Sequence, residues 1–194
     1  MVKHTGKPGK TKLILLTGGL GYLGSLIAIE LLARGETVRI ATSRKDAILP
    51  DALNQCELFV IDFFDLQNLK RATNGAYLII HLAGMNALDS NRNPLEASRI
   101  NGLGTRNLLK SAQFCRVNRF IYFSTIHVYG TPLQGSLTEE TVTQPISQYA
   151  ISNRMAEDYV LSIKGLDTVI LRLSNVFGIP NDKKSEAWKL VVND

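Results

Sequence analysis

The sequence predicts an α/β fold in which a doubly wound parallel sheet carries helices on both faces. Short apolar runs alternate repeatedly with longer helical patterns along the chain, as in folds of this class. The apolar runs are nearly continuous, which is typical of strands that helices cover on both sides. With 194 residues, 45% hydrophobic and 20% charged, the chain suffices for one domain with a substantial core.

The first strand and helix follow from the apolar pattern after a lysine-rich start. Leu13–Leu16 is a short apolar run, as expected of a strand buried on both faces. Apolar side chains recur at helical spacing over Tyr22–Ala33, and Gly35 ends that pattern in the usual stop position. The ordered part of the chain is therefore expected to begin with strand, turn and helix.

The next elements are two strands and a short helix. Thr37–Ala41 and Glu57–Ile61 combine β-branched, aromatic and other apolar residues in strand-length runs. Asp65–Thr73 is expected to be a short helix, because the Asp65 carboxylate can cap the first backbone N–H groups.

The second half of the chain continues the alternation of strands and helices. In order, we expect a strand at Tyr77–Leu82, a long helix at Pro94–Cys115, a strand at Arg119–Ser124, a loop rich in Gly, Pro, Thr and Gln at Gly130–Ser147, a helix at Gln148–Ile163 and a strand at Thr168–Leu171.

A glycine-rich turn separates the first strand from the first helix. Gly18, Gly21 and Gly24 have the spacing GxxGxxG. Gly19, Gly21 and Gly24 also satisfy the pattern GxGxxG. Glycine serves a sharp turn, close approach of a pyrophosphate and tight packing of helix on strand, and the helix N-terminus attracts the phosphates. In this context the turn predicts a Rossmann-type domain over residues 12–180 that holds NAD or NADP.

The end of the second strand bears on which dinucleotide is bound. A carboxylate there would bind the ribose 2′-hydroxyl, but the chain has none before Asp46. Thr42, Ser43 and Arg44 could receive a 2′-phosphate, with Arg44 as the bidentate partner. We therefore favour NADP over NAD, the alternative being that Arg44 and Lys45 are solvated loop charges.

Charge and composition exclude several other function classes. The net charge of +5 comes largely from Lys3, Lys7, Lys10 and Lys12, so a basic flexible leader at residues 1–11 precedes a nearly neutral domain, and no nucleic acid partner is expected. The chain has no signal-peptide pattern and no apolar run long enough to span a membrane. The expected location is the cytoplasm.

The cysteines and histidines suggest no metal site. Cys56 and Cys115 form no C-x-x-C pair and are expected to be reduced thiols. The histidines His4, His81 and His127 lack metal-ligand spacing.

Several motifs follow one another along the chain: TGGLGYLG at Thr17–Gly24, Asp62-Phe63, His81-Leu82-Ala83-Gly84, Asn101, Ser124–Gly130 (SSxxVYG-like), Pro145–Ser152 (the approach to YxxxK) and Leu171–Gly178 (LRxxNxxG). Taken together and in order, they resemble the motifs of the extended short-chain dehydrogenase/reductase family, especially its NAD-dependent epimerase/dehydratase group, which acts on nucleotide sugars.

This resemblance assigns roles to individual positions. Cofactor contacts are expected from Gly18, Gly21, Tyr22, Leu23, Gly24, Thr42, Ser43, Arg44, Asp62, Phe63, Leu82, Ala83, Gly84, Asn101 and Tyr149, and substrate contacts from Asn86, Thr125 and Asn175. The catalytic positions are Thr125, Tyr149 and Asn153. Tyr149 would exchange a proton with the substrate oxygen during hydride transfer, and Thr125 would hydrogen-bond the same oxygen.

Asn153 departs from the family pattern, which has a lysine at this position. The lysine would lower the pKa of the tyrosine, which is about 10 in water. Asparagine can still bond the nicotinamide ribose but carries no charge. Arg154 is one position further along and about 100° around the helix, so it does not substitute directly.

The chain departs from the family pattern in two further ways, one bearing on the reaction and one on the substrate-binding region. Sugar dehydratases of the family carry an Asp-Glu pair after the threonine, whereas this chain has Ile126 and His127, so dehydration is not expected. A lone histidine such as His127 is more often packed or hydrogen-bonded than catalytic. Residues 181–194, with a helical pattern at Ser185–Val192, are expected to begin a truncated substrate-binding region.

The leading interpretation is an NAD(P)-dependent epimerase or reductase of a nucleotide-linked sugar. The alternatives are a reductase of a non-sugar carbonyl, or a non-catalytic NAD(P)-binding or redox-sensing protein, which Asn153 favours. The resemblance also implies a homodimer formed through the helices at Pro94–Cys115 and Gln148–Ile163.

Overall fold

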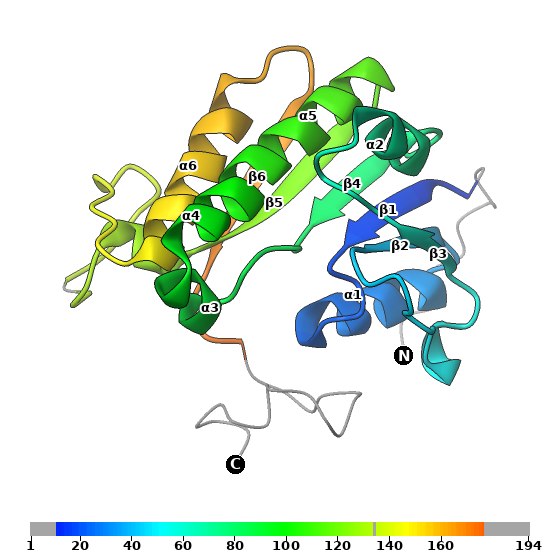
Figure 1. Ribbon diagram of the computed structural model, residues 1–194, viewed down its shortest axis with the longest axis horizontal. Helices are drawn as coiled ribbons and strands as arrows, with labels where there is room; N and C mark the ends of the chain where they lie inside the picture. The colour runs from blue at the N-terminus through cyan, green and yellow to red at the C-terminus, as the bar shows by residue number, and fades with distance from the viewer. Residues whose placement is uncertain (1–10, 134, 177–194) are drawn as a thin grey trace.

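The sheet has the predicted doubly wound, parallel arrangement. The computed structural model describes residues 11–133 and 135–176. All strands pair in parallel in the order β3-β2-β1-β4-β5-β6 (Figure 1). Their bounds are β1 Leu13–Thr17, β2 Thr37–Thr42, β3 Glu57–Val60, β4 Leu78–His81, β5 Arg119–Thr125 and β6 Asp167–Leu173.

Helices cover both faces of this sheet, as predicted. In Figure 1, α2, α5 and α6 lie together over one face, and α1 lies apart from them. The α-helices are α1 Tyr22–Ala33, α2 Leu66–Thr73, α3 Ala87–Arg92, α4 Pro94–Ala97, α5 Thr105–Phe114 and α6 Gln148–Ser162. Short helical turns are η1 (3₁₀) Asp51–Leu53, η2 (π) Ser98–Gly104 and η3 (3₁₀) Ile126–Tyr129.

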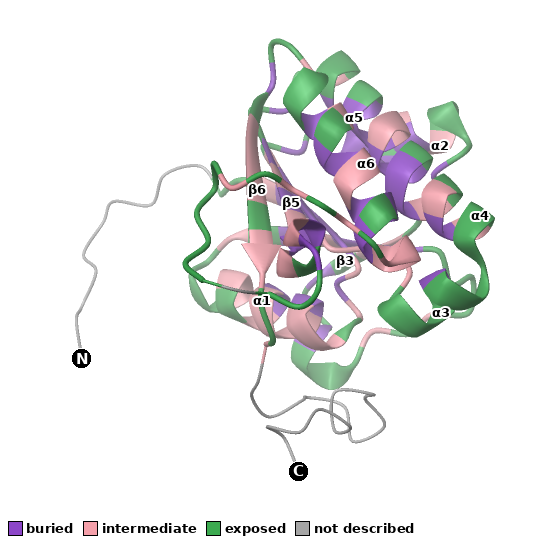
Figure 2. Ribbon diagram, turned by 90° about the vertical axis from the view of Figure 1, so that its left-hand side faces the viewer, coloured by how far each residue is buried: buried purple, intermediate pink, exposed green. Residues whose placement is uncertain are grey.

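Alternation along the strands divides the core into two clusters. On β1, Leu16 packs with Ala28 of α1 on one face. Its neighbour Leu15 packs with Leu108 of α5 and Ala156 of α6 on the other face, because successive side chains of a strand point to opposite sides. Figure 2 shows the buried surfaces of α5 and α6 facing the sheet.

Two element predictions need correction. The long helix predicted at Pro94–Cys115 is interrupted by the π-helical stretch η2, which α4 precedes and α5 follows. Helical periodicity did not reveal the change, because a π turn adds only one residue to a turn. The helix α3 and the turns η1 and η3 were not predicted; short helices of this kind carry little periodic signal.

Asp65 caps α2 as predicted. Its carboxylate accepts hydrogen bonds from the backbone N–H groups of Gln67 (2.8 Å) and Asn68 (3.0 Å). The helix expected at Ser185–Val192 and all but the last residue of the basic leader lie outside the described residues, so both stay predictions.

Candidate functional site

The glycine-rich turn joins β1 to α1 at the carboxyl end of the sheet. Gly18 has φ +72°, and a Cβ there would lie 2.9 Å from the backbone nitrogen of Ala83. The Gly21 N–H donates to the Gly18 carbonyl at 2.9 Å. At Gly24 a Cβ would collide with the same Gly18 carbonyl. Any larger residue at Gly18 or Gly24 would therefore force the turn to shift.

The start of α1 is arranged to receive an anion. Gly21 is the N-cap and provides no side-chain cap, and the first turn holds no acidic residue. Tyr22, Leu23 and Gly24 form that turn, so the positive end of the helix dipole points toward the glycine-rich turn. A cradle of backbone with no Cβ and no competing carboxylate fits a pyrophosphate.

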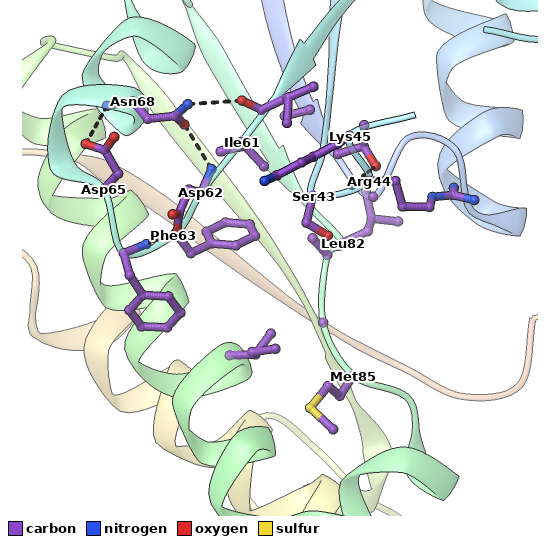
Figure 3. A pocket seen from close by; sticks show the side chains of 18 of the residues that line it. Ser43, Arg44, Lys45, Ile61, Asp62, Phe63, Asp65, Asn68, Leu82 and Met85 are labelled. Atoms are coloured by element: carbon purple, nitrogen blue, oxygen red, sulfur yellow. Dashed lines mark hydrogen bonds between the residues drawn. The ribbon is translucent and has the colours of Figure 1, made fainter. Parts of the chain in front are cut away.

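A cleft of about 860 Å³ extends from this turn across the carboxyl ends of the strands. Figure 3 shows the side chains around it. The predicted cofactor residues among its lining are Gly18, Gly21, Thr42, Ser43, Arg44, Asp62, Phe63, Leu82, Ala83 and Gly84. The structure thus brings together positions scattered over four strand ends, where parallel sheets commonly bind nucleotides.

The end of β2 presents two cationic side chains to this cleft. The Thr42 hydroxyl accepts the Arg44 backbone N–H at 3.2 Å, which fixes the turn. Lys45 extends across the cleft toward Ile61, whereas Arg44 points to the opposite side (Figure 3). Neither forms an ion pair with any described residue. Our prediction named Arg44 and treated Lys45 only as a solvated loop charge.

The loop after β3 is rigidly held beside the cleft. The Asp62 carboxylate accepts the Phe64 N–H at 2.8 Å, and the Asp62 N–H donates to the Asn68 side chain at 2.9 Å. The Arg99 guanidinium lies 3.8 Å from the centre of the Phe64 ring. Phe64, Asn68 and Arg99 line the cleft and were not predicted, because no motif marks them.

His81 is a fully buried connector beneath the site and not a surface group. The Thr105 hydroxyl donates to the Asn101 carbonyl at 2.6 Å, so it accepts from His81 Nε2–H at 2.9 Å. Nδ1 is then the acceptor for the Thr17 hydroxyl at 2.6 Å, and Thr17 in turn accepts the Ala83 N–H. Burial lowers the pKa of His81 to about 3, which keeps the ring neutral.

Asn101 links the loop after β4 to α6. From the π turn η2, its side-chain oxygen accepts the Met85 N–H at 2.7 Å and its amide donates to Ser152 Oγ at 2.9 Å. It lies at the edge of a second, smaller cleft, of about 230 Å³. Residues 82–85 line both clefts and so connect them.

The second cleft contains the predicted catalytic residues Tyr149 and Asn153. Tyr122, Phe123, Asn86 and Asn101 also line it. Thr125, at the end of β5, is buried and hydrogen-bonded to the Tyr149 side chain. Burial raises the pKa of Tyr149, and the bond to Thr125 offsets only part of that increase.

Both polar atoms of the Asn153 side chain form hydrogen bonds within the protein. Its oxygen accepts the Tyr122 hydroxyl at 2.8 Å, and its amide donates to the Tyr149 carbonyl at 2.8 Å. Arg154 forms ion pairs with Glu157 and Asp158. Tyr122 was not predicted; the signal that could have found it is its place on β5, three residues before Thr125.

A buried ion-pair cluster supports the ends of β5 and β6. The Glu157 carboxylate, fully buried, accepts from Ser124 at 2.6 Å and from two nitrogens of Arg172 at 3.0 and 2.8 Å. Burial alone would raise the pKa of Glu157, but hydrogen bonds from Arg172, Ser124 and Arg154 outweigh it and hold that pKa below its usual range. The cluster fixes the side chain of Ser124, the residue that precedes Thr125 on β5.

The remaining predicted positions lie at different distances from the clefts. Asn86 lines the smaller cleft and caps α3, its oxygen accepting the Asp89 N–H at 2.9 Å. Asn175 is exposed beyond β6 and lines neither cleft, and His127 is exposed in η3. No cluster of metal-ligating side chains occurs in the described part of the chain. No described helix is long and apolar enough to cross a membrane.

Comparison with known proteins gives consistent relatives. A family model described as the NAD dependent epimerase/dehydratase family matches residues 14–193. UDP-glucose 4-epimerase of Erwinia amylovora is 33% identical over 181 residues, covering 85% of this chain and 53% of that protein. UDP-arabinose 4-epimerase 1 of Arabidopsis thaliana is 31% identical over 197 residues, covering 93% and 47%. The chain thus spans about half the length of these curated relatives.

Solved structures show the same similarity. UDP-glucose 4-epimerase with UDP-glucose from Thermotoga maritima gives a TM-score of 0.78 at 26% identity, over 90% of this chain and 59% of that one. UDP-glucose 4-epimerase from Brucella ovis in complex with NAD gives 0.74 at 25% identity, over 84% and 51%.

Proposed function

The chain belongs to the NAD dependent epimerase/dehydratase family, and from that premise we propose that it binds a nicotinamide dinucleotide and transfers a hydride to or from a nucleotide-linked sugar. One observation carries this proposal: the phosphate cradle and Tyr149 border two clefts that join at residues 82–85. A dinucleotide that places its pyrophosphate on the Gly18–Gly24 turn can extend through that junction toward Tyr149.

Each part of the site has a separate task in this function. The glycine turn and the start of α1 would bind the pyrophosphate, and Asp62 the adenine edge. When bound, the nicotinamide supplies or accepts the hydride. Thr125 and Tyr149 would hold the substrate oxygen, and the Tyr149 phenol would transfer a proton at that oxygen. The substrate class follows from relatives that act on UDP-linked sugars.

We propose NADP as the preferred cofactor, although similar structures contain NAD. The support is the absence of a carboxylate at the end of β2 and the presence of Arg44 and Lys45 beside the cleft. A 2′-phosphate there would accept charge-assisted hydrogen bonds from one or both.

Fluorescence titration of the purified chain with NADPH and with NADH tests this preference. We expect tighter binding of NADPH, and a loss of that preference in Arg44→Ala, in Lys45→Ala or in both. Arg34→Ala serves as the control, because Arg34 pairs with Glu30 on the exposed side of α1. Equal affinity for the two cofactors, unchanged by either substitution, would assign NAD to this site and make both side chains solvated charges.

A second candidate function is a non-catalytic NAD(P)-binding or redox-sensing protein, which the uncharged Asn153 favours. Tyr149→Phe distinguishes the two. In an enzyme it abolishes turnover of a UDP-linked sugar, whereas a binding or sensing protein has no such turnover to lose. Absence of turnover in the unsubstituted chain with saturating cofactor, for sugar and non-sugar carbonyl substrates alike, would favour the binding protein.

A further inference from the structure

The immediate neighbours of the Tyr149 hydroxyl group carry no positive charge. Asn153, one helical turn away, is 5% exposed, and its two amide atoms are bonded to the Tyr122 hydroxyl and the Tyr149 carbonyl. The partner of the Tyr149 hydroxyl is Thr125, which is neutral. The hydroxyl group therefore lies in a neutral hydrogen-bonded environment.

The arginine next to Asn153 on α6 and the arginine of β6 both pair with carboxylates. Arg154 pairs with Glu157 at 3.0 Å and with Asp158 at 2.7 Å. Arg172 of β6 is bonded to Glu157 and to the Tyr129 hydroxyl. The other titratable groups on the elements packed against α6 are Arg119 and Tyr122 of β5, His127 and Tyr129 of η3, Asp89 and Arg92 of α3, Glu96 of α4, Arg99 of η2, Arg106 and Lys110 of α5, and Asp167 of β6; Arg99 pairs with Glu96. Of these, Tyr122 alone lines the smaller cleft.

We propose that Asn153, held by Tyr122, leaves Tyr149 as a neutral proton donor, so that at neutral pH the site reduces the keto form of a nucleotide-linked sugar and does not oxidise its alcohol form. A neutral phenol can give a proton to a developing alkoxide, but only a phenolate can remove one from an alcohol. The raised pKa of Tyr149, caused by burial, agrees with this assignment. The inference rests on the proposed function and specifies its direction and substrate class.

The proposed reduction balances with the groups named. The carbonyl carbon of the substrate receives a hydride from the reduced nicotinamide as its C=O π bond opens. The carbonyl oxygen takes the phenolic proton of Tyr149, and the resulting phenolate regains a proton from water. Overall, a ketone, the reduced dinucleotide and one proton give an alcohol and the oxidised dinucleotide.

The first test needs neither cofactor nor turnover. Ultraviolet difference spectra record the ionisation of the six tyrosines as the pH rises, and subtraction of the Tyr149→Phe spectrum isolates Tyr149. Tyr77→Phe, a surface substitution, controls for the subtraction. We expect Tyr149 to ionise above pH 10 in the free protein; ionisation near neutral pH would overturn the inference, whether or not the chain is an enzyme.

A lysine at position 153 should reverse this behaviour. Asn153→Lys places a cation within one helical turn of Tyr149. The pH at which Tyr149 ionises should therefore fall by about one to three units. The substitution is also made together with Tyr122→Phe, because the Tyr122 hydroxyl contacts the side chain at position 153. If neither variant that folds shifts the Tyr149 transition, Asn153 does not determine the charge state.

Rates in both directions complete the test. With a UDP-linked keto sugar and reduced cofactor, the rate should be constant through neutral pH and fall as Tyr149 ionises. With the corresponding alcohol and oxidised cofactor, the rate should rise about tenfold per pH unit, and Asn153→Lys should move that rise to lower pH. Equal rates in both directions at pH 7 would overturn the inference, whereas no turnover with bound cofactor would instead contradict the proposed function.

Discussion

At the scale of single residues, His81 connects the two halves of the site. The chain of hydrogen bonds from Ala83 through Thr17, His81 and Thr105 to Asn101 has one consistent direction, which fixes the neutral tautomer. A positive ring could not accept from Thr17, so protonation would break the connection.

This burial makes stability dependent on pH. The folded pKa of His81, about 3, lies below the unfolded value of about 6.5. The unfolded chain therefore binds a proton that the folded chain does not, and stability present above pH 6.5 is lost as the pH falls toward 3. Urea unfolding should show a loss of about 1.4 kcal/mol per pH unit from this group between pH 6.5 and 5.

His81→Gln provides the comparison. The variant should be less stable at pH 7, because it loses buried hydrogen bonds, but it should lose less stability between pH 7 and pH 5 than the unsubstituted chain. If both proteins lose the same free energy of unfolding over that interval, His81 is not the group responsible.

The stability of the fold also depends on the positive charge of Arg172. Arg172→Leu leaves the fully buried Glu157 with Arg154 as its remaining cation, and removal of one partner from a buried pair costs about 3 kcal/mol or more. Urea unfolding measures the effect. Arg34→Leu, in an exposed pair with Glu30, should cost less than about 1 kcal/mol; similar losses in the two variants would contradict the assignment.

Sequence reasoning named many of the residues that line the two clefts, but it missed Phe64, Asn68, Arg99 and Tyr122 and did not show how each side chain is used. The glycine pattern located the phosphate cradle because the turn requires residues without a Cβ. It could not show that Lys45 extends across the cleft while Arg44 points to the opposite side (Figure 3), or that the Tyr122 hydroxyl donates to the Asn153 side-chain oxygen. Those contacts depend on side-chain directions at the ends of different strands, which local patterns do not encode.

At the scale of elements, the π turn η2 explains where Asn101 and α6 meet. Gly102 and Gly104 lie in it, and a Cβ on Gly102 would lie 2.5 Å from the Met155 sulfur of α6. A Cβ on Gly104 would lie 3.4 Å from Phe63. The close approach of η2 to α6 brings the Asn101 amide within reach of Ser152.

The turn between β1 and α1 gives an element-scale prediction. Gly24→Ala would place a methyl group against the Gly18 carbonyl, so the turn must shift, and such overpacking costs about 1–3 kcal/mol. We expect dinucleotide affinity to fall at least about tenfold, measured by fluorescence titration.

Gly35→Ala is the matched control for this substitution. Gly35 has φ +79° with open space around it, so alanine there strains the backbone and lowers stability far from the cleft. It should leave dinucleotide affinity unchanged. A similar loss of affinity in both variants would attribute the effect to general destabilisation.

At the scale of the whole molecule, the sheet order places β1 and β4 side by side at the centre. The chain runs outward from β1 to β3 and then returns to β4, so the loops after β1 and β4 diverge and leave the crevice between them. Sequence alternation predicted the strands and their parallel pairing. The end of β4 could be placed beside the glycine turn only through the resemblance.

The position of the cleft predicts how ligand binding affects unfolding. Strand ends from both sides of β1 line it, so a bound dinucleotide should stabilise the domain as a unit. At a ligand concentration of about 100 times Kd, the free energy of unfolding should rise by about 2.7 kcal/mol. Calorimetry should show one transition that moves to higher temperature; a second transition left unmoved would mean that the halves unfold separately.

The hydrogen-bonded His81 ring also has a practical consequence. Its two nitrogens have fixed and different roles, one as donor to Thr105 and the other as acceptor from Thr17, and nitrogen chemical shifts in magnetic resonance distinguish such roles. Thr17 precedes the cradle and Thr105 follows the π turn η2, so a ligand that moves either segment should change one signal before the other. Isotope labelling of histidine would make this buried ring a native reporter that distinguishes ligands at the two clefts without an added dye.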